Sequence, residues 1–481
     1  MEVSRNYQAS MFINGQWRKP YSGELIGVNN PATGELIAEL GWGGIEEAKE
    51  AVDVAAHAFQ TWKRTTARER ADVLQKAYNL IHQREEQIGY VLANESGKRL
   101  SEAVGEVHFA SEYFRWFAEE ARRPNGAYIP NEVPNKRHWT RAQPAGVVLS
   151  LTPWNFPVSI QARKLAPALA AGCTVVARAS QKTPLSVIEM FHCLEEAGFP
   201  EGVVNLIQGP ASITTEAMMQ HKAVRVISFT GSTPVGQSLI RMSATGVQHL
   251  ALELGGNAPF IVFEDADIAK AVEGAMLAKF RNNGQSCIAA NRFFVHSGIY
   301  DEFVQKWTHA VEHMRLSDPL VDPESDLGPV IDAPKWNELH VWIDEATRKG
   351  AHQVNKLIQR PDKGYFFSPV LLENVSEDTK VAYEEIFGPV SPIFRFQDED
   401  EVIERANRTE MGLAAYVYTA RADRGTRVTE ALDYGIVGWN HALPSVAFAP
   451  MGGWKHSGLG REGGRLGMEE FQEVKYISQE I

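Results

Sequence analysis

The chain has 481 residues, of which 44% are hydrophobic and 22% charged, and this composition indicates a globular protein rather than a disordered or membrane-spanning one. Its length exceeds the roughly 100–200 residues of one domain, so we expect several domains. The net charge of −12 argues against nucleic-acid binding, and no apolar run reaches the ~18 residues that cross a bilayer. The chain starts without a signal-peptide pattern, and its three cysteines suggest no disulfide framework. We therefore expect a cytoplasmic protein with no membrane or nucleic-acid partner.

Two amphipathic helices are predicted near the start of the chain. Apolar residues recur at three- and four-residue steps over 45–62, which is typical of a helix with one buried face. The same period continues over 67–92, where Thr65 and Thr66 are candidates for the capping residue.

Short apolar segments then alternate with helical ones between residues 146 and 262. The predicted strands are 147–151, 174–177, 203–207, 226–229 and 260–262, and the predicted helices are 158–171, 185–197 and 235–244. Alternation of continuous apolar strands with helices predicts a parallel sheet that is covered on both faces. This is a doubly wound architecture of the kind that binds nucleotides.

A second α/β unit follows, with a helix predicted over 268–279 and a strand over 293–296, and it extends to about residue 439. Two further strand-like segments, 136–141 and 468–481, have no obvious sheet of their own. Each fits an exposed sheet edge, which can pair with another subunit or within the chain, and both alternatives stay open.

Cys287 differs from the other two cysteines in its surroundings. Cys173 and Cys193 lie among apolar residues, as is typical of buried thiols that pack as small hydrophobic groups. Cys287 follows the small, polar residues 282–286, which can hold a thiol open to a substrate. An exposed cysteine is more often inert than catalytic, so its partners must decide between the two interpretations.

A nucleophilic thiol needs a base and a donor for the developing oxyanion. Glu253 ends an apolar strand segment and precedes two glycines, which places it at the sheet edge where ligands bind. Burial would raise its pKa toward that of a general base, whereas a solvated strand-end carboxylate is the plainer alternative. Asn155 follows the strand ending at Leu151 and can donate to an oxyanion together with the Cys287 amide, although Asn often serves only its own turn.

The turn after the strand at 226–229 offers a place for a phosphate. The G-x-G-x-x-G fingerprint is absent, but residues 230–234 (Thr-Gly-Ser-Thr-Pro) open a predicted helix whose free amides can hold a pyrophosphate. This signal is weak, because capped helices are common. The sequence predicts no metal site.

Together these segments resemble the aldehyde dehydrogenase superfamily over almost the entire chain. The matching motifs are 153–157 (PWNFP), 229–232 (FTGS), 253–257 (ELGGN), 284–287 (GQSC), 385–389 (EIFGP), 452–453 (GG) and 457–458 (SG). The resemblance implies that Cys287 is the nucleophile, Glu253 the general base and Asn155 an oxyanion donor, with Lys164 and Glu473 as a proton relay. The alternative is a family member that has lost the chemistry and serves only as a structural protein, but the presence of Cys287, Glu253 and Asn155 argues against this.

The resemblance also implies two doubly wound α/β domains and a small β arm for assembly into a homodimer or homotetramer. We assign residues 1–123 and 146–257 to an NAD(P)-binding domain, 258–464 to a catalytic domain, and 124–145 with 465–481 to the arm. The expected cofactor-binding residues are Thr152, Pro153, Trp154, Arg178, Ser180, Gln181, Lys182, Gly209, Thr230, Gly231, Ser232, Leu254, Glu385 and Phe387. Glu385 is expected on the nicotinamide ribose and Phe387 against the nicotinamide.

Within the superfamily the chain is most similar to succinate-semialdehyde dehydrogenases. Arg163, Arg281 and Ser445 match carboxylate-binding positions of that group, and paired arginines recognise a carboxylate by charge-assisted hydrogen bonds. Succinate semialdehyde is therefore the first candidate substrate. The alternatives are 2-oxoglutarate semialdehyde, a sulfonated or phosphonated aldehyde, or a broad range of aldehydes.

The chain departs from the family pattern near the expected adenosine ribose. Gln181 stands where NAD-preferring members carry a glutamate, and Arg178 and Lys182 add positive charge. We therefore expect that NADP is accepted and consider it a candidate for the preferred cofactor. Ala289 excludes a local disulfide with Cys287, and Met451 replaces a usual phenylalanine near the substrate end.

Overall fold

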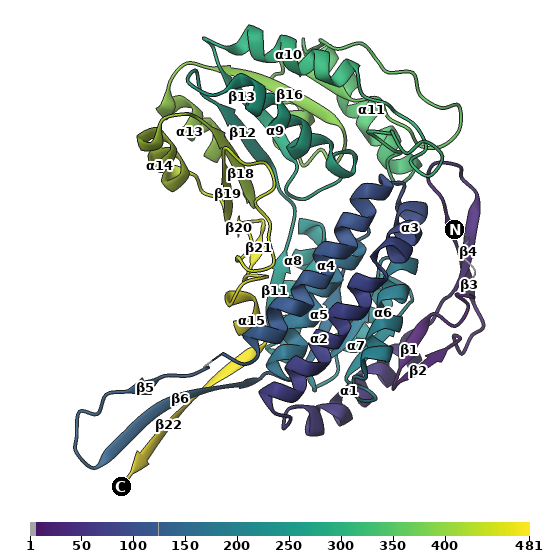
Figure 1. The fold of residues 1–481 in the computed structure, drawn as a ribbon, viewed down its shortest axis with the longest axis vertical. Helices are drawn as coiled ribbons and strands as arrows, with labels where there is room; N and C mark the ends of the chain where they lie inside the picture. The colour runs from purple at the N-terminus through teal and green to yellow at the C-terminus, as the bar shows by residue number, and fades with distance from the viewer. Residues whose placement is uncertain (1–5, 124) are drawn as a thin grey trace.

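The computed structural model describes residues 6–123 and 125–481 and shows three parts: two sheets with helices packed on them and a three-stranded arm (Figure 1). None of the helices in these ranges is long and apolar enough to cross a membrane. The chain passes from the first sheet to the second between β11 (His249–Glu253) and β12 (Ala258–Val262).

Parallel strands form the centre of the first sheet. In spatial order they are β9 (Val204–Ile207), β8 (Thr174–Arg178), β7 (Val147–Leu151), β10 (Val224–Thr230) and β11. Every residue of β7, β8 and β9 is buried, because helices cover both faces. Antiparallel strands β1 (Met11–Ile13), β2 (Gln16–Arg18) and β21 (Gly458–Leu459) lie at the edges. The predicted doubly wound α/β fold is confirmed.

Two layers of helices cover this sheet. One layer holds α2 (Ala67–Gln83), α3 (Glu85–Ser96), α4 (Leu100–Glu120), α5 (Pro157–Ala171) and α6 (Leu185–Ala197) (Figure 1). The other holds α1 (Ile45–Trp62), α7 (Ala211–Met219) and α8 (Thr233–Gly246). All 15 residues of α5 are buried, since α5 lies between the sheet and α4.

The helices before the first buried strand differ from the sequence prediction in two ways. The helix predicted over 67–92 is divided at Arg84, whose backbone leaves the helical region (φ −109°, ψ 14°). Helix α4 was not predicted, although its buried residues Ala103, Val107, Ala110 and Phe114 follow the helical period.

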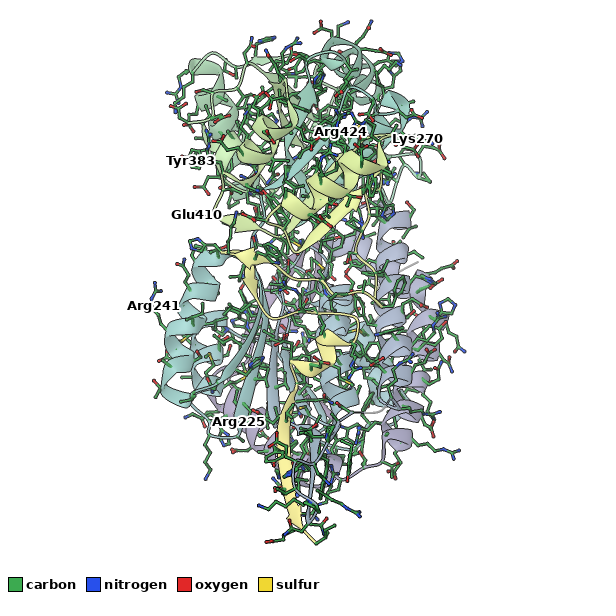
Figure 2. All side chains as sticks on the ribbon, turned by 90° about the vertical axis from the view of Figure 1, so that its left-hand side faces the viewer. Arg225, Arg241, Lys270, Tyr383, Glu410 and Arg424 are labelled. Carbon is green, nitrogen blue, oxygen red and sulfur yellow. The ribbon has the colours of Figure 1, made fainter. Side chains whose placement is uncertain are left out.

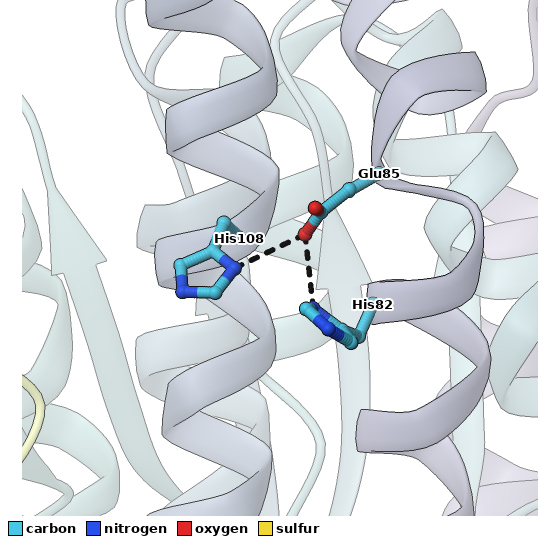
Figure 3. A group of neighbouring side chains, drawn as sticks. All are labelled: His82, Glu85 and His108. Atoms are coloured by element: carbon cyan, nitrogen blue, oxygen red, sulfur yellow. Dashed lines mark hydrogen bonds and ion pairs between the residues drawn. The ribbon is translucent and has the colours of Figure 1, made fainter.

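Where α2 ends and α3 begins, one carboxylate contacts two imidazoles (Figure 3). Glu85 Oε2 lies 3.0 Å from His82 Nδ1 and 3.1 Å from His108 Nδ1. Because His108 belongs to α4, this group joins three helices at the surface.

The second sheet has the order β14 (His352–Gln353), β15 (Val370–Glu373), β16 (Val390–Phe396), β13 (Ala290–His296), β12, β18 (Ala414–Tyr418) and β19 (Ile436–Trp439). All its pairings are parallel except that of the edge strand β14. Its larger helices are α9 (Ile268–Phe280), α10 (Tyr300–Glu312), α11 (Ala333–Arg348), α13 (Glu399–Asn407) and α14 (Ala422–Ala431).

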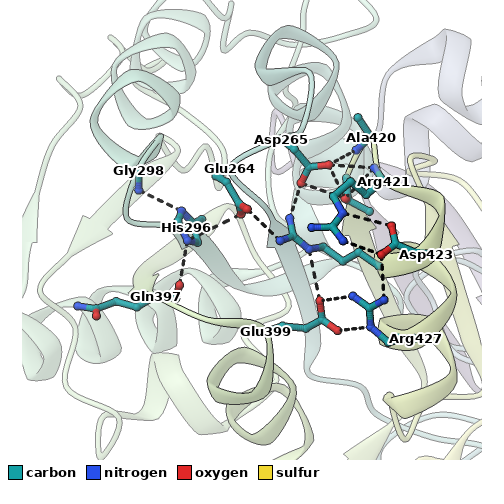
Figure 4. A network of polar contacts seen from close by, with 12 residues as sticks. Glu264, Asp265, His296, Gly298, Gln397, Glu399, Ala420, Arg421, Asp423 and Arg427 are labelled. Carbon is teal, nitrogen blue, oxygen red and sulfur yellow. Dashed lines mark hydrogen bonds and ion pairs between the residues drawn. The ribbon is translucent and has the colours of Figure 1, made fainter.

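An ion-pair network fastens α14 to the end of β12 (Figure 4). The guanidinium of Arg424 donates to Glu264 at 2.9 Å and to Asp265 at 2.5 Å, and it lies 3.4 Å from Glu399. Asp265 also accepts hydrogen bonds from the backbone amides of Ala420 and Arg421. The network ties β12, α13 and α14 together far from the cysteine, so we assign it a structural role.

The arm contains the two strand-like segments for which the sequence showed no obvious sheet. β6 (Lys136–Pro144) pairs antiparallel with β22 (Gln472–Glu480) of the same chain, and the short β5 (Tyr128–Ile129) lies on the other side of β6. The pairing is therefore intramolecular. Figure 2 shows the yellow β22 reaching below the body of the molecule. On β22, the side chains of Val474 and Tyr476 are exposed.

Candidate active site

A cavity of about 800 Å³ lies between the carboxyl ends of β7, β10 and β11 and the loops of the second α/β unit. Its lining residues are Pro153, Trp154, Asn155, Lys182, Thr230, Gly231, Ser232, Glu253, Leu254, Gly255, Cys287, Ile331, Asp332, Pro334, Lys335, Glu338, Glu385 and Phe387. The cavity thus brings together the predicted nucleophile, base and oxyanion donor with most of the expected cofactor residues. Ligand sites of parallel α/β sheets lie at this edge.

The sequence analysis missed the part of the wall that belongs to the start of α11. Asp332 caps this helix by accepting a 3.0 Å hydrogen bond from the Lys335 amide, and Pro334 occupies its first turn. An aspartate followed shortly by a proline is a helix-start signal that the sequence offered.

Cys287 is the one cysteine that is partly exposed, whereas Cys173 and Cys193 are buried as predicted. Burial of its sulfur, together with the neighbouring Glu253 carboxylate, raises the pKa of the Cys287 thiol well above its usual value. The resting thiol is therefore protonated at neutral pH, and its attack on a substrate requires a base.

The loop that carries Cys287 is held in an unusual conformation. Asn282, Asn283 and Gly284 all have positive φ angles, of 50°, 56° and 73°. A left-handed turn of this length suits Asn and Gly, because Gly lacks a Cβ and the short amide side chain of Asn can form local hydrogen bonds. Hydrogen bonds fix it: Asn283 Nδ2 donates to the Pro329 carbonyl at 2.6 Å, and Gln285 accepts one from the Ile331 amide at 2.9 Å.

Glu253 ends β11 with a side chain that is almost fully buried beside the cysteine. Burial raises its pKa, and the positive charge of Arg163 offsets part of this rise. Neither carboxylate oxygen accepts a hydrogen bond of full geometry within residues 6–123 and 125–481. The thiol of Cys287 lies close enough for the two groups to shift each other's pKa. A buried carboxylate without a fixed partner is suited to accept a proton from a thiol or from water.

Asn155 lies against the cysteine loop from the other sheet. Its Nδ2 donates to the Gln285 carbonyl at 3.1 Å, while its own backbone carbonyl accepts hydrogen bonds from Asn282 Nδ2 at 3.0 Å and Lys98 Nζ at 2.7 Å. The amide donor thus lies beside the loop of the thiol, where an oxyanion would form.

The expected relay of Lys164 and Glu473 is wrong in its second member. Glu473 lies exposed on β22, where it pairs with Gln143 of β6, whereas the fully buried Lys164 forms an ion pair with Glu462. Glu462 also pairs with Arg163 Nε at 2.9 Å. The partner of Lys164 thus lies in the loop that precedes α15 (Leu466–Glu469) and not in the final strand.

The buried group of Arg163, Lys164 and Glu462 contains two cations and one carboxylate and therefore has a net positive charge. Although burial favours the neutral form, Lys164 and Arg163 hold the pKa of Glu462 below its usual value. Burial also favours the neutral form of Arg163, but the negative charge of Glu462 and other neighbours keeps the pKa of Arg163 above its usual range. The remaining charge is balanced by Glu253 when that carboxylate is ionised.

The expected substrate residues differ in their surroundings. Arg163 is buried and contacts the sulfur of Met451, and Ser445 Oγ lies 3.5 Å from the same sulfur. Arg281 lies over the ring of Phe156, 4.9 Å from its centroid, and lines a separate cavity of about 310 Å³. Arg281 is therefore the more accessible of the two arginines.

Most of the expected cofactor residues line the cavity of Cys287. Helix α8 starts at Ser232 without a side-chain cap, and the nearby Thr230 hydroxyl is buried without a partner in the part of the chain that the structure describes. Helix amides and a free hydroxyl of this kind can hold phosphates. A Cβ at Gly231 would lie 2.4 Å from the Phe229 ring, so this turn requires a glycine.

The nicotinamide end of this cavity is expected at Glu385 and Phe387. Glu385 Oε1 accepts a 3.1 Å hydrogen bond from the Gly256 amide, and burial raises its pKa to about 8. Phe387 adopts a positive φ of 52° and packs edge to face on Trp154 with centroids 5.4 Å apart. Both side chains line the cavity that holds Cys287.

At the end where the adenosine ribose is expected, the positively charged side chains of Arg178 and Lys182 both have partners within the protein. Arg178 donates to the Gly209 carbonyl at 3.0 Å, and burial lowers its pKa to about 10. Lys182 Nζ pairs with Asp332 at 2.5 Å. Gln181 is exposed and lines an adjoining cavity of about 400 Å³ together with Lys182. Of the remaining expected residues, Ser180 is partly buried and Thr152 donates to Gln161.

Comparison with known proteins places this geometry in a family. The model of the aldehyde dehydrogenase family matches residues 17–477. The 3-sulfolactaldehyde dehydrogenase of Pseudomonas putida is 46% identical over 97% of this chain and 96% of its own length, and the NADP-dependent succinate-semialdehyde dehydrogenase of Escherichia coli K12 is 43% identical over 98% of each. The crystal structure of succinate-semialdehyde dehydrogenase from Burkholderia pseudomallei superposes with a TM-score of 0.96 at 41% identity, covering 99% of this chain and 98% of that one. The chain therefore belongs to the aldehyde dehydrogenase family and is an oxidoreductase that acts on aldehydes.

Proposed function

We propose that this enzyme oxidises a short aldehyde with a distal anionic group to the acid through a covalent bond to Cys287. The observation that carries the proposal is the partly exposed Cys287 thiol, which shares one cavity with the buried Glu253 carboxylate and the Asn155 amide. The cofactor is NAD or NADP, as in relatives named for NADP and in solved relatives that contain NAD or NADP.

The residues in the cavity suit each step in turn. Glu253 accepts the thiol proton, and the Cys287 sulfur adds to the aldehyde carbon to form a thiohemiacetal. Asn155 Nδ2 and the Cys287 amide donate hydrogen bonds to the oxygen of this thiohemiacetal. The oxygen loses its negative charge as hydride departs and the thioester forms. A nicotinamide held beside Glu385 and Phe387 would supply the acceptor for that hydride. Glu253 releases the thiol proton to solvent and then takes a proton from water, which attacks the thioester; this proton passes to the departing Cys287 sulfur as the acid is released.

Glu253→Gln is expected to separate the two halves of this reaction. The first turnover should still give a burst of reduced cofactor, but a slower one, because the Cys287 thiol must then lose its proton to water, whereas the steady-state rate should fall by about 10²–10⁴-fold, because the amide cannot accept a proton from the attacking water. In the unaltered enzyme the rate should increase with pH through the raised pKa of Glu253, and this dependence should vanish in the variant. Rapid-mixing absorbance of reduced cofactor tests both points. An unchanged steady-state rate would exclude Glu253 as the base.

Succinate semialdehyde is the leading candidate substrate. Arg163 is buried and shares the Glu462 carboxylate with Lys164, whereas Arg281 is partly exposed, so Arg281 is the more accessible arginine for an anion. Relatives are named for succinate semialdehyde, glutarate semialdehyde and 3-sulfolactaldehyde, and each of these aldehydes carries an acidic group at its far end. A sulfonated aldehyde is therefore the second candidate, since a guanidinium binds either anion.

Arg281→Met should raise the KM for succinate semialdehyde by about 10–100-fold, as expected for the loss of a charged hydrogen bond of about 1.5–3 kcal/mol. The KM for butanal, which has the same chain length without the charge, serves as the control and should change little. Steady-state assays with succinate semialdehyde, 3-sulfolactaldehyde and butanal measure both effects. If butanal had the highest kcat/KM in the unaltered enzyme, the assignment of an anionic substrate would be refuted.

Gln181 should allow NADP to be used, because it offers no negative charge to a 2′-phosphate. The kcat/KM ratio should favour NAD by no more than about tenfold, or roughly 1.4 kcal/mol. Gln181→Glu should lower kcat/KM with NADP by at least about tenfold and leave the value with NAD within about twofold. The control is Gln220→Glu, which adds the same charge on the exposed end of α7. Equal loss with both cofactors would contradict this role.

We also propose a cytoplasmic enzyme that assembles as a homodimer or homotetramer through its arm. The support is the projecting β22, whose outer edge and exposed Val474 and Tyr476 are available to another subunit. The residue ranges given above for the NAD(P)-binding domain, the catalytic domain and the arm form part of this proposal.

A further inference from the structure

Lys98 and Glu106 form an ion pair whose two side chains are fully buried behind the cavity of Cys287. Lys98 Nζ lies 2.5 Å from Glu106 Oε2 and donates to the backbone carbonyl of Asn155 at 2.7 Å. It also lies over the ring of Phe156, 4.3 Å from the centroid. One ammonium group therefore contacts two consecutive residues, of which Asn155 is the proposed oxyanion donor.

Glu106 fixes the helix that follows Asn155. Its Oε1 accepts hydrogen bonds from the backbone amides of Val158 at 3.0 Å and Ser159 at 3.2 Å. These amides belong to the first turn of α5, which has no side-chain cap of its own. Because α5 carries Arg163 and Lys164, the position of Glu106 also determines where those cations lie.

The same end of α4 holds the cysteine loop. Glu102, one turn before Glu106, accepts a 3.0 Å hydrogen bond from the Asn282 amide, and Asn282 Nδ2 donates to the carbonyl of Asn155. The Asn155 carbonyl thus receives one donor from Lys98 and one from the loop of Cys287. Buried contacts of this kind, which do not reach the substrate, set the geometry of the groups that do.

We propose that Lys98 and Glu106 are positioning residues that hold the Asn155 amide and the start of α5 in register with Cys287. This inference rests on the proposed function, because it assigns Lys98 an effect that acts through Asn155. The hydrogen bond from Lys98 to the Asn155 carbonyl fixes the position of the Asn155 amide donor. Displacement of a catalytic group by about 1 Å can lower the reaction rate 10²-fold.

The test is the rate constant of the first burst of reduced cofactor, measured per active site with the burst amplitude as the count of intact sites. Lys98→Met should lower this rate constant by at least about tenfold while the dissociation constant of the reduced cofactor stays within about twofold. Where the unpaired Glu106 charge prevents folding, Lys98→Met/Glu106→Gln removes both charges and keeps an oxygen for the amides of α5. The same loss is expected in the double variant.

Two comparisons separate positioning from a general loss of structure. In an Asn155→Ala background, Lys98→Met should slow the burst by less than about twofold, because the group it positions is absent. Lys279→Met removes another fully buried lysine, whose Nζ donates to Asn291 Oδ1 at 3.4 Å, and should leave the rate constant unchanged. An unchanged rate constant in both Lys98 variants, or a full loss in the Asn155→Ala background, would overturn the inference. A missing burst in the unaltered enzyme with every aldehyde would instead refute the proposed function.

A separate surface group, His82, Glu85 and His108, has the chemistry of a metal site (Figure 3). Each of the three side chains offers one ligand atom within 4.8 Å of the other two, and Glu85 Oε2 lies 3.0 Å from His82 Nδ1 and 3.1 Å from His108 Nδ1. Ligand atoms of a tetrahedral zinc ion with bonds of ~2.1 Å are about 3.4 Å apart. The His82 Nδ1 atom is buried and has no hydrogen bond of full geometry within the described part of the chain.

We propose that this group binds one Zn²⁺ and thereby joins the ends of α2, α3 and α4. The side chains are 26–51% exposed, so a water molecule can take the fourth position. Two imidazoles and one carboxylate are ligands that zinc prefers.

Competition with a chromophoric chelator tests zinc binding in a full-length Cys287→Ala background, which removes the partly exposed thiol as a ligand. We expect one zinc per chain and a higher Tm when zinc is added. Both effects should disappear in His108→Ala and persist in His313→Ala, which alters a histidine pair at the end of α10 with centroids 4.1 Å apart. No uptake in the background protein, or equal uptake in His108→Ala, would contradict the proposal.

Discussion

A reciprocal pair of hydrogen bonds between Asn155 and the cysteine loop is the contact on which the site depends. Asn155 follows β7 of the first sheet, whereas Asn282, Gln285 and Cys287 precede β13 of the second. The Asn155 amide donates to Gln285 and its carbonyl accepts from Asn282, so each segment fixes the other. Thiol and oxyanion donor come from different α/β units, and this contact keeps them within reach of one substrate atom.

The electrostatics of the site follow from burial. Arg163, Lys164 and Glu462 carry a net positive charge, and Glu253 provides the balancing carboxylate next to the thiol. Because burial raises the pKa of both Cys287 and Glu253, the resting pair holds its protons more tightly than the free groups. A site of this kind favours proton transfer from sulfur to carboxylate at the moment of attack rather than a permanent thiolate.

The sequence was sufficient for features that depend on local patterns. Continuous apolar strands alternating with helices predicted the first sheet, and the polar segment before Cys287 distinguished it from the two buried cysteines. Features that depend on distant packing were missed. Glu462 and Glu473 both lie near the end of the chain, and only the folded loop before α15 shows that Glu462 reaches Lys164.

The support of the site by α4 is a further feature that no local pattern could reveal. Glu102 and Glu106 appear in the sequence as ordinary charges on an amphipathic helix, which usually face solvent. Their burial follows from the packing of α4 against α5, and the amides of Asn282, Val158 and Ser159 offset its cost. The pairing of β6 with β22 likewise joins segments more than 300 residues apart.

The central claim is that the substrate becomes covalently bound to Cys287 and that Glu253 is needed to release it. Peptide mass spectrometry of Glu253→Gln, quenched after mixing with NADP and succinate semialdehyde, tests this directly. The account predicts a succinyl group on the peptide that contains Cys287 and none on the peptides of Cys173 and Cys193. Rapid formation of reduced cofactor without any adduct on Cys287 would contradict it.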